Sequence, residues 1–320
     1  MLKYKLVMKM KNKRILYMGT PVFSQYILEK LIENGFNVIG LVSQPDRPVG
    51  RKKIITPTPT KVVDLKYGLP IYQPERIKDD YEFIKELNPD VIITCAYGQF
   101  VPQGLLDIPP FGCINIHASL LPKLRGGAPI QHALIDGFDK TGVTLMEMIK
   151  KMDAGRMYAK VETEITDEDT YDSLHDRLKV LGAELILNNL ELYLEGKLEG
   201  IPQDENEVTI SPNISKEEEH LDFNKTSREV FNHIRGLSSI PGAHFKYNNE
   251  TVKVYKSRII KSNSNEENGT IINVSKDSID IKTSDGAIGI LEFQLQGKTR
   301  IKVKDYLNGN NKFQIGTKIE

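Results

Sequence analysis

Over the first two thirds of the chain, apolar runs alternate with segments of helical periodicity. Residues 14–19 form an apolar run that predicts a buried strand, and after it Phe23, Ile27, Leu28 and Leu31 recur at the spacing of one helix face. The same pattern predicts strands at 37–43, 69–72, 90–96, 113–117 and 142–148, and helices at 61–67, 81–87 and 128–136. Strands separated by helices favour a mostly parallel sheet covered on both faces.

A long amphipathic helix is predicted after Asp169, which is expected to cap it. Its apolar face would consist of Leu174, Leu178, Leu181, Leu185 and Leu192. Two other segments of this region read as loops. Residues 44–60 are rich in Pro, Arg and Lys and predict a long polar loop, and residues 202–212 form an acidic stretch that predicts a linker.

The pattern changes beyond residue 212. One helix is expected at 227–237, and the rest consists of short alternating segments at 243–247, 251–259, 269–274, 278–282 and 288–293. Asn, Gly and Asp residues divide these segments, as is typical of a small β-barrel. At the other end, residues 1–13 hold five lysines and no acidic residue. We expect them to be a disordered extension.

Length and composition narrow the class of protein. A chain of 320 residues predicts two domains. No apolar run approaches the ~20 residues needed to span a bilayer, so a membrane protein is not expected. The two cysteines, Cys95 and Cys113, both lie inside predicted strands. They match no disulfide framework and no zinc spacing, which predicts buried, reduced thiols and a cytoplasmic protein.

The balance of 43 basic and 43 acidic residues conceals clusters of positive charge. Residues 46–61 are one basic cluster, and residues 246–261 carry five basic residues against Glu250. A third cluster alternates without acidic residues and consists of Lys298, Arg300, Lys302 and Lys304. Segregated positive surfaces could meet a polyanion. On charge alone, solvated protein faces are the simpler interpretation.

Candidate chemistry is expected where the parallel strands end. No G-x-G-x-x-G follows the first strand and no P-loop occurs, which removes the main support for dinucleotide and nucleoside-triphosphate chemistry. Asn115 and His117 stand two residues apart in one strand, so their side chains share a face. A carboxamide and an imidazole there could hold an oxyanion and move a proton. For an isolated pair, two satisfied polar groups at a strand end would be the simpler interpretation.

Asp153 favours the catalytic interpretation. It follows the strand at 142–148, which is predicted to end at the same sheet edge, where the carboxylate could orient and charge the His117 imidazole. The set lacks a serine or cysteine nucleophile. We therefore expect direct attack by an amine of the substrate.

These residues carry a resemblance to a known family. Asn115-Ile-His-Ala-Ser-Leu-Leu-Pro122 resembles the signature of formyltransferases that use 10-formyltetrahydrofolate, and Met-Asp153-Ala-Gly is similar to the site of that family's catalytic aspartate. Further similarities point to members that formylate methionyl initiator tRNA. They run through nearly the whole chain and are Met18–Pro21, Gln44–Lys53, Ala96–Gln99, Arg125–Gln131, Gln296–Lys298 and Asp305–Gly309.

The resemblance implies an α/β fold: a Rossmann-like, mostly parallel sheet in a folate-binding formyltransferase domain at 14–201, a linker at 202–212, and an OB-like β-barrel that binds tRNA at 213–320. Asn115, His117 and Asp153 would be catalytic. The residues expected to line the folate crevice are Ser119, Leu120, Leu121 and Pro122. Those expected to contact tRNA are Arg47, Arg51, Lys52, Lys53, Lys253, Lys256, Arg258, Lys298 and Arg300. No metal and no membrane are expected, and a monomer is preferred.

Two departures from the family pattern stand out. Residues 239–243 read Ser-Ile-Pro-Gly-Ala where many relatives carry Asn-Pro-Trp-Pro-Gly, and Arg156 replaces the common acidic residue or proline. The alternatives are a formyltransferase acting on an amino sugar nucleotide or on glycinamide ribonucleotide, and a non-catalytic RNA-binding protein. The second domain argues against the glycinamide ribonucleotide enzyme, and the loop at 44–53 argues against the sugar enzyme.

Overall fold

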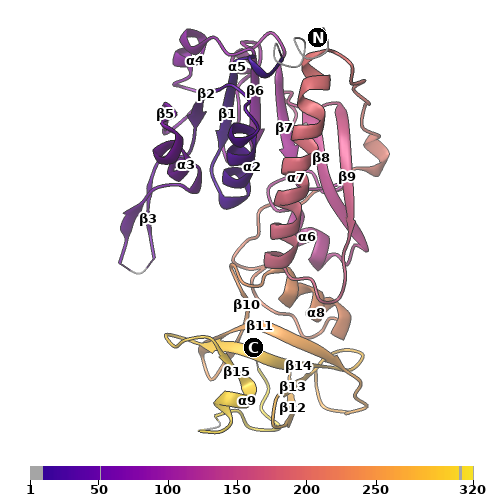
Figure 1. Cartoon of the computed structure of the whole chain (residues 1–320). Helices are drawn as coiled ribbons and strands as arrows, with labels where there is room; N and C mark the ends of the chain where they lie inside the picture. Colours follow the sequence, from indigo (N-terminus) through magenta and orange to yellow (C-terminus); the bar gives the residue numbers. More distant parts are fainter. Residues whose placement is uncertain (1–9, 51, 310–311, 320) are drawn as a thin grey trace. The chain divides into compact units, whose positions relative to one another are not determined.

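The computed structural model describes residues 10–50, 52–309 and 312–319. They form two compact units, shown in Figure 1. The first unit comprises the chain up to Gly126 together with Thr141–Thr163 and His175–Ile210, and the second comprises Gly127–Lys140, Glu164–Leu174 and Ser211–Glu320. The chain thus passes between the units several times.

A seven-stranded sheet in the order β5-β2-β1-β6-β7-β8-β9 forms the centre of the first unit. Its strands are β1 (Ile15–Gly19), β2 (Val38–Val42), β5 (Ile71–Tyr72), β6 (Val91–Cys95), β7 (Cys113–His117), β8 (Lys140–Glu147) and β9 (Met157–Glu164). The pairs from β5 to β7 are parallel. The predicted mostly parallel sheet is therefore confirmed.

Helices cover this sheet because its strands are apolar on both faces. One face is covered by α2 (Val22–Glu33) and α7 (Tyr171–Leu194). Gly182 of α7 packs closely against Ile27 of α2 and Ile116 of β7, because a Cβ atom added at this glycine would lie only 3.2 and 3.4 Å from their side chains. The other face carries a buried cluster around Met18, Ile92 and Cys113. The remaining helices of this unit are α3 (Pro59–Tyr67), α4 (Glu82–Leu87) and α5 (Gln103–Leu106).

Three predicted features of this unit were wrong in detail. β8 runs antiparallel to β7, so it does not end at the sheet edge where β7 ends. The segment 44–60 is not a plain loop but contains a hairpin of β3 (Arg47–Val49) and β4 (Ile54–Thr56). Leu192 does not belong to the buried face of α7, because its side chain is 39% exposed.

Residues 10–13 also depart from the expected disordered extension. The backbone N–H of Asn37 donates to the carbonyl of Lys11, and Lys13 forms an ion pair with Asp90 at 3.1 Å. These contacts tie the segment to the edge of the sheet. The earlier part of the expected extension, residues 1–9, lies outside the described residues.

The second unit contains an antiparallel sheet in the order β10-β11-β14-β13-β12, with β15 paired to β14. Its strands are β10 (Ala243–Tyr247), β11 (Glu250–Ile260), β12 (Ile271–Val274), β13 (Ile279–Lys282), β14 (Ala287–Leu295) and β15 (Ile301–Lys302). Its helices are α6 (Pro129–Ile135), α8 (Ser227–Gly236) and α9 (Val303–Tyr306). The predicted C-terminal antiparallel β domain is confirmed.

One buried cluster holds this domain together. Val230 and Ile234 of α8 pack with Val254, Ile281 and Phe293 of the sheet. Because β11 alternates between buried and outward positions, its polar residues are left on the opposite face. Among the residues described in either unit, no helix has the length and apolar character needed to cross a bilayer.

Candidate active site

Asn115 and His117 lie on one face of β7, at the carboxyl edge of the parallel part of the sheet. His117 is buried, with 6% of its surface exposed, and Asn115 is half-buried. The spacing of two residues in a strand gives them this shared face, as predicted from the sequence.

Hydrogen bonding fixes the tautomer of the His117 ring. Its Nε2 lies 2.9 Å from the carbonyl oxygen of Leu124. A carbonyl only accepts, so Nε2 carries the proton and donates it. The neutral ring therefore keeps its lone pair on Nδ1, which is the atom available to take up a proton.

Asp153 reaches the same place from the connection between β8 and β9. Its Oδ2 lies 3.8 Å from Nδ1 of His117 and accepts a 2.9 Å hydrogen bond from the backbone N–H of Gly126. The Asp153 backbone is left-handed, with φ of 49°. The two side chains meet even though β8 is antiparallel, because the connection returns toward the end of β7.

Residues 201–210 support both sides of this arrangement, and we call them the strap. Gln203 donates from Nε2 to the carbonyls of Asp153 and Gly155, both at 2.8 Å, and its Oε1 accepts from Nε of the buried Arg125 at 2.9 Å. The backbone N–H of Arg125 donates in turn to the carbonyl of Thr209. The strap therefore joins the segment that bonds His117 to the segment that carries Asp153.

Ion pairs also connect the strap to its surroundings. Arg125 is only 2% exposed, and its Nη2 donates to Glu205 at 3.0 Å. Lys151 reaches the other oxygen of Glu205 at 2.6 Å. These hydrogen bonds, Lys151 first and Arg125 next, hold the pKa of the Glu205 carboxyl below its usual range. The sequence pattern had indicated only a polar linker here.

The four residues expected to line a folate crevice lie in the turn after β7. Ser119 is fully buried and its hydroxyl donates to the carbonyl of Lys123 at 2.7 Å. Leu121 packs in a small buried cluster, Pro122 is also buried, and Leu120 is half-buried. Ser119, Leu121 and Pro122 are therefore buried in the turn and support its conformation. Their contact with folate stays a prediction.

The described residues expected to contact tRNA in the first unit are Arg47, Lys52 and Lys53, which lie on the β3–β4 hairpin that extends away from the sheet in Figure 1. Arg47 is 61% exposed at its side chain and pairs with Glu75 at 2.7 Å. Lys52 and Lys53 are exposed in the turn, whereas Arg51 lies outside the described residues. Apolar side chains also face solvent here, since Ile55 is 70% exposed.

In the second unit, the expected tRNA contacts lie on the outward side of β11 and in the segment that follows β14, and we call this surface the β11/β14 face. Lys253 and Lys256 pair in register with Gln294 and Glu292. Arg300 reaches Glu292 with two hydrogen bonds of 2.8 and 3.0 Å, and its guanidinium lies 4.4 Å from the centre of the Tyr255 ring.

Not every basic residue of this region is free to meet a polyanion. Arg258 forms two hydrogen bonds with Asp277, at 3.0 and 3.2 Å. Lys253 donates to the carbonyl of Pro241. Within the described ranges, the side chains of Lys256 and Lys298 are exposed and have neither a hydrogen bond nor an ion pair. These two lysines are therefore free to meet a polyanion at this face, whereas the Lys253 ammonium is charged but already bonded to a carbonyl.

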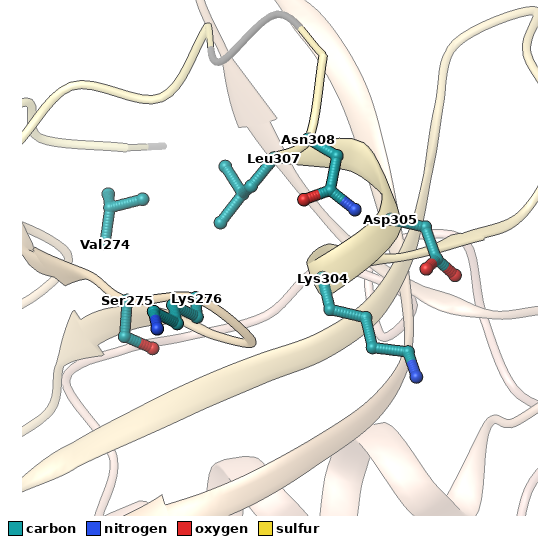
Figure 2. A pocket seen from close by; sticks show the side chains of 7 residues that line it. All are labelled: Val274, Ser275, Lys276, Lys304, Asp305, Leu307 and Asn308. Atoms are coloured by element: carbon teal, nitrogen blue, oxygen red, sulfur yellow. The ribbon is translucent and has the colours of Figure 1, made fainter.

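A separate groove of the second unit was not predicted from the sequence. It lies between α9 and the turn from β12 to β13, as Figure 2 shows. Its lining consists of Val274, Ser275, Lys276, Lys304, Asp305, Leu307 and Asn308. Two lysines, Lys276 and Lys304, and one aspartate, Asp305, line it, so the groove carries a net positive charge.

Other reactive groups are masked by burial. Both cysteines are free thiols in the buried interior, and desolvation raises the pKa of Cys95 and of Cys113 to about 12. Three or more His, Cys, Asp or Glu side chains grouped as metal ligands do not occur among the described residues.

Comparison with known proteins identifies the family of this chain. Residues 13–190 match the family described as formyl transferase, and residues 213–311 match the formyl transferase C-terminal domain. The chain is 47% identical over 309 residues to the methionyl-tRNA formyltransferases of Bacillus thuringiensis (strain Al Hakam) and of Bacillus anthracis. In each case the match covers 96% of this chain and 98% of the relative.

Solved structures share the fold at low sequence identity. The crystal structure of HypX from Aquifex aeolicus in complex with tetrahydrofolic acid matches with a TM-score of 0.63 at 20% identity, over 92% of this chain and 47% of HypX. The N-formyltransferase from Helicobacter canadensis, in complex with folinic acid and dTDP-3-aminofucose, matches with a TM-score of 0.64 at 18% identity, over 87% and 98%. On the strength of the two family matches and of relatives aligned over nearly its full length, this chain belongs to the formyl transferase family.

Proposed function

We propose that this protein transfers the formyl group of 10-formyltetrahydrofolate to the α-amine of methionyl initiator tRNA, for translation initiation. The observation that carries the proposal is the 3.8 Å approach of His117 and Asp153 beside Asn115, in a chain 47% identical to methionyl-tRNA formyltransferases. These three residues are the proposed catalytic set.

In the proposed reaction, the α-amine nitrogen bonds to the formyl carbon, and the bond from that carbon to N10 of the folate breaks. The carbonyl oxygen becomes an oxyanion in between, and the Asn115 amide donates a hydrogen bond to it. The proton lost by the amine passes to Nδ1 of His117, because Nε2 already donates to Leu124. The imidazolium then returns a proton to N10, so that the charges balance.

Asp153 has an electrostatic role in this scheme. A carboxylate 3.8 Å from Nδ1 stabilises the imidazolium that forms when His117 takes up the proton. The hydrogen bond from Gly126 keeps one carboxylate oxygen pointed at the ring. Folate is proposed to bind beside the turn at 119–122, and Leu124, two residues after this turn, supplies the carbonyl that orients His117.

The domain roles follow the same proposal. Residues 14–201 form the catalytic domain, 202–212 the linker and 213–320 the tRNA-binding domain. The basic segment 44–60, through Arg47, Arg51, Lys52 and Lys53, would contact the acceptor stem, since phosphate contacts position a nucleic acid. The β11/β14 face would hold the RNA backbone through Lys253, Lys256, Arg258, Lys298 and Arg300. Such a protein would act as a monomer in the cytoplasm, where charged tRNA is found.

One assay tests the proposal against its alternatives. Purified protein is given 10-formyltetrahydrofolate and, separately, methionyl initiator tRNA, an amino sugar nucleotide or glycinamide ribonucleotide. Formylation of the tRNA alone is the expected result. Preferential formylation of either small acceptor would refute the proposal, and so would tRNA binding without transfer to any acceptor.

A further inference from the structure

Thr94 places a hydroxyl group beside Asn115 within an otherwise apolar strand. It lies in β6 and is 3% exposed. β6 and β7 are parallel neighbours, and Thr94 pairs in register with Asn115. Paired residues of adjacent strands point to the same face, so the two side chains lie together beneath the site.

The Thr94 hydroxyl has one proton and three acceptors within reach. They are Oδ1 of Asn115 at 2.8 Å, the sulfur of Met148 at 2.9 Å and the carbonyl oxygen of Ile114 at 3.3 Å. A thioether is a weak acceptor, and the amide oxygen of Asn115 is the nearer of the two oxygens. The proton therefore goes to Asn115, which fixes Oδ1 toward the interior of the sheet.

The other end of the same amide is open. Throughout the described residues, Nδ2 of Asn115 has no hydrogen bond to protein, and it is not among the buried atoms that lack a partner. A group with those two properties faces solvent. The nitrogen is thus free to donate to a substrate oxygen.

We infer that Thr94 is a positioning residue for formyl transfer, which holds the Asn115 amide so that its nitrogen faces the formyl oxygen. This inference rests on the role proposed above for Asn115. The two ends of a carboxamide have nearly the same shape, so packing does not choose between them. In the flipped form Nδ2 would donate to the Thr94 hydroxyl, whose proton would be left with the Ile114 carbonyl at 3.3 Å or the weakly accepting sulfur of Met148, so hydrogen bonding favours the observed orientation. The opposite orientation would turn lone pairs toward the developing oxyanion and oppose the reaction.

The test compares four variants of the full chain with the wild type. Thr94→Val and Thr94→Ala remove the donor, Thr94→Ser keeps it, and Asn115→Ala removes the group it acts on. We expect kcat to fall on the order of 10- to 100-fold in Thr94→Val and Thr94→Ala, since misplacement of a catalytic group costs about that much. The KM values for both substrates should change little, and Thr94→Ser should recover most of kcat.

A double variant separates positioning from general support of the fold. In Thr94→Val/Asn115→Ala, the Thr94 change should cost little beyond Asn115→Ala alone, because its target is gone. The inference is overturned if a folded donor-free variant keeps wild-type kcat, or if the Thr94 change costs as much without Asn115. If Asn115→Ala itself keeps wild-type kcat, the proposed role of Asn115 fails instead.

Discussion

Nδ1 of His117 and Oδ2 of Asp153 lie 3.8 Å apart, while the other ring nitrogen donates to the carbonyl of Leu124. The ring is thus held at one nitrogen and faces a carboxylate with the other. Because Nε2 already carries a proton, Nδ1 is the nitrogen that can accept one. The negative charge of Asp153 is therefore the property that stabilises the protonated ring.

We therefore expect Asp153→Asn to fold normally and to lose activity. An amide still accepts from Gly126 but carries no charge to stabilise the imidazolium, so kcat should fall roughly 10²- to 10⁴-fold. Steady-state formylation of methionyl initiator tRNA measures this. Asp79→Asn is the matched control, because Asp79 pairs with Arg76 at the surface. Equal kcat in the two variants would remove Asp153 from the proposed mechanism.

Gln203 should matter for both stability and turnover. Gln203→Leu keeps the size of the side chain but removes three hydrogen bonds and leaves the buried Nε of Arg125 without its acceptor. Leaving a buried donor unsatisfied costs about 1–3 kcal/mol in the free energy of unfolding. Because Gln203 holds the carbonyl of Asp153, kcat should fall as well.

Chemical denaturation and steady-state kinetics measure the two effects. Gln103→Leu provides the comparison, since Gln103 is exposed and bonds to Asp107 within one helix turn. A Gln203→Leu enzyme with unchanged kcat would limit the strap to a role in stability.

Binding of tRNA should depend on Lys256 and Lys298, the two lysines of the β11/β14 face whose side chains are exposed and have no hydrogen bond or ion pair within the described chain. Lys256→Ala/Lys298→Ala should weaken the affinity and reduce the slope of log Kd against log salt by about one to two, since each phosphate contact contributes ~0.9. Filter binding over a range of salt concentrations measures both quantities.

The groove in Figure 2 supplies the control for charge. Lys276→Ala/Lys304→Ala removes the same net charge from another surface of the same domain. We expect a smaller loss of affinity in this variant. Equal losses would mean that total charge, and not the β11/β14 face, governs binding.

Neither cysteine should react in the folded protein. With a pKa of about 12, each thiol is ionised to only ~10⁻⁴ at pH 8, and both are buried. Iodoacetamide followed by intact-mass measurement should therefore add no label within hours, whereas two labels should appear after denaturation. Rapid labelling of the native protein would show that β6 and β7 open readily.

The sequence predicted the parts of the site that depend on local periodicity. Asn115 and His117 share a face because they stand two residues apart in a strand, and apolar runs predicted that strand with the observed bounds. The sequence also predicted that Asp153 lies near His117, but on the wrong ground that the strand before it ends at the same sheet edge as β7. β8 is antiparallel to β7 and ends at the opposite edge. The direction of a strand depends on long-range packing, which periodicity does not encode.

The supporting residues had no comparable signal. Thr94 belongs to an apolar run and its role depends on register with another strand, while Gln203 belongs to a segment that resembles a solvated linker. The hairpin at 47–56 was missed because Pro, Gly and Lys indicate a loop, and its isoleucines are exposed. Residues that act through distant partners become visible only in three dimensions.

A fragment of this protein that is active by itself should have to include the strap, residues 201–210. A piece ending at residue 201 would retain Asn115, His117 and Asp153 but would lack Gln203 and Thr209, which bond the segments around them. Limited proteolysis within 202–209 should thus silence the enzyme while sparing every proposed catalytic side chain. The stretch between the two sequence-defined domains is bonded to the segments that carry the proposed catalytic residues and is not merely a tether.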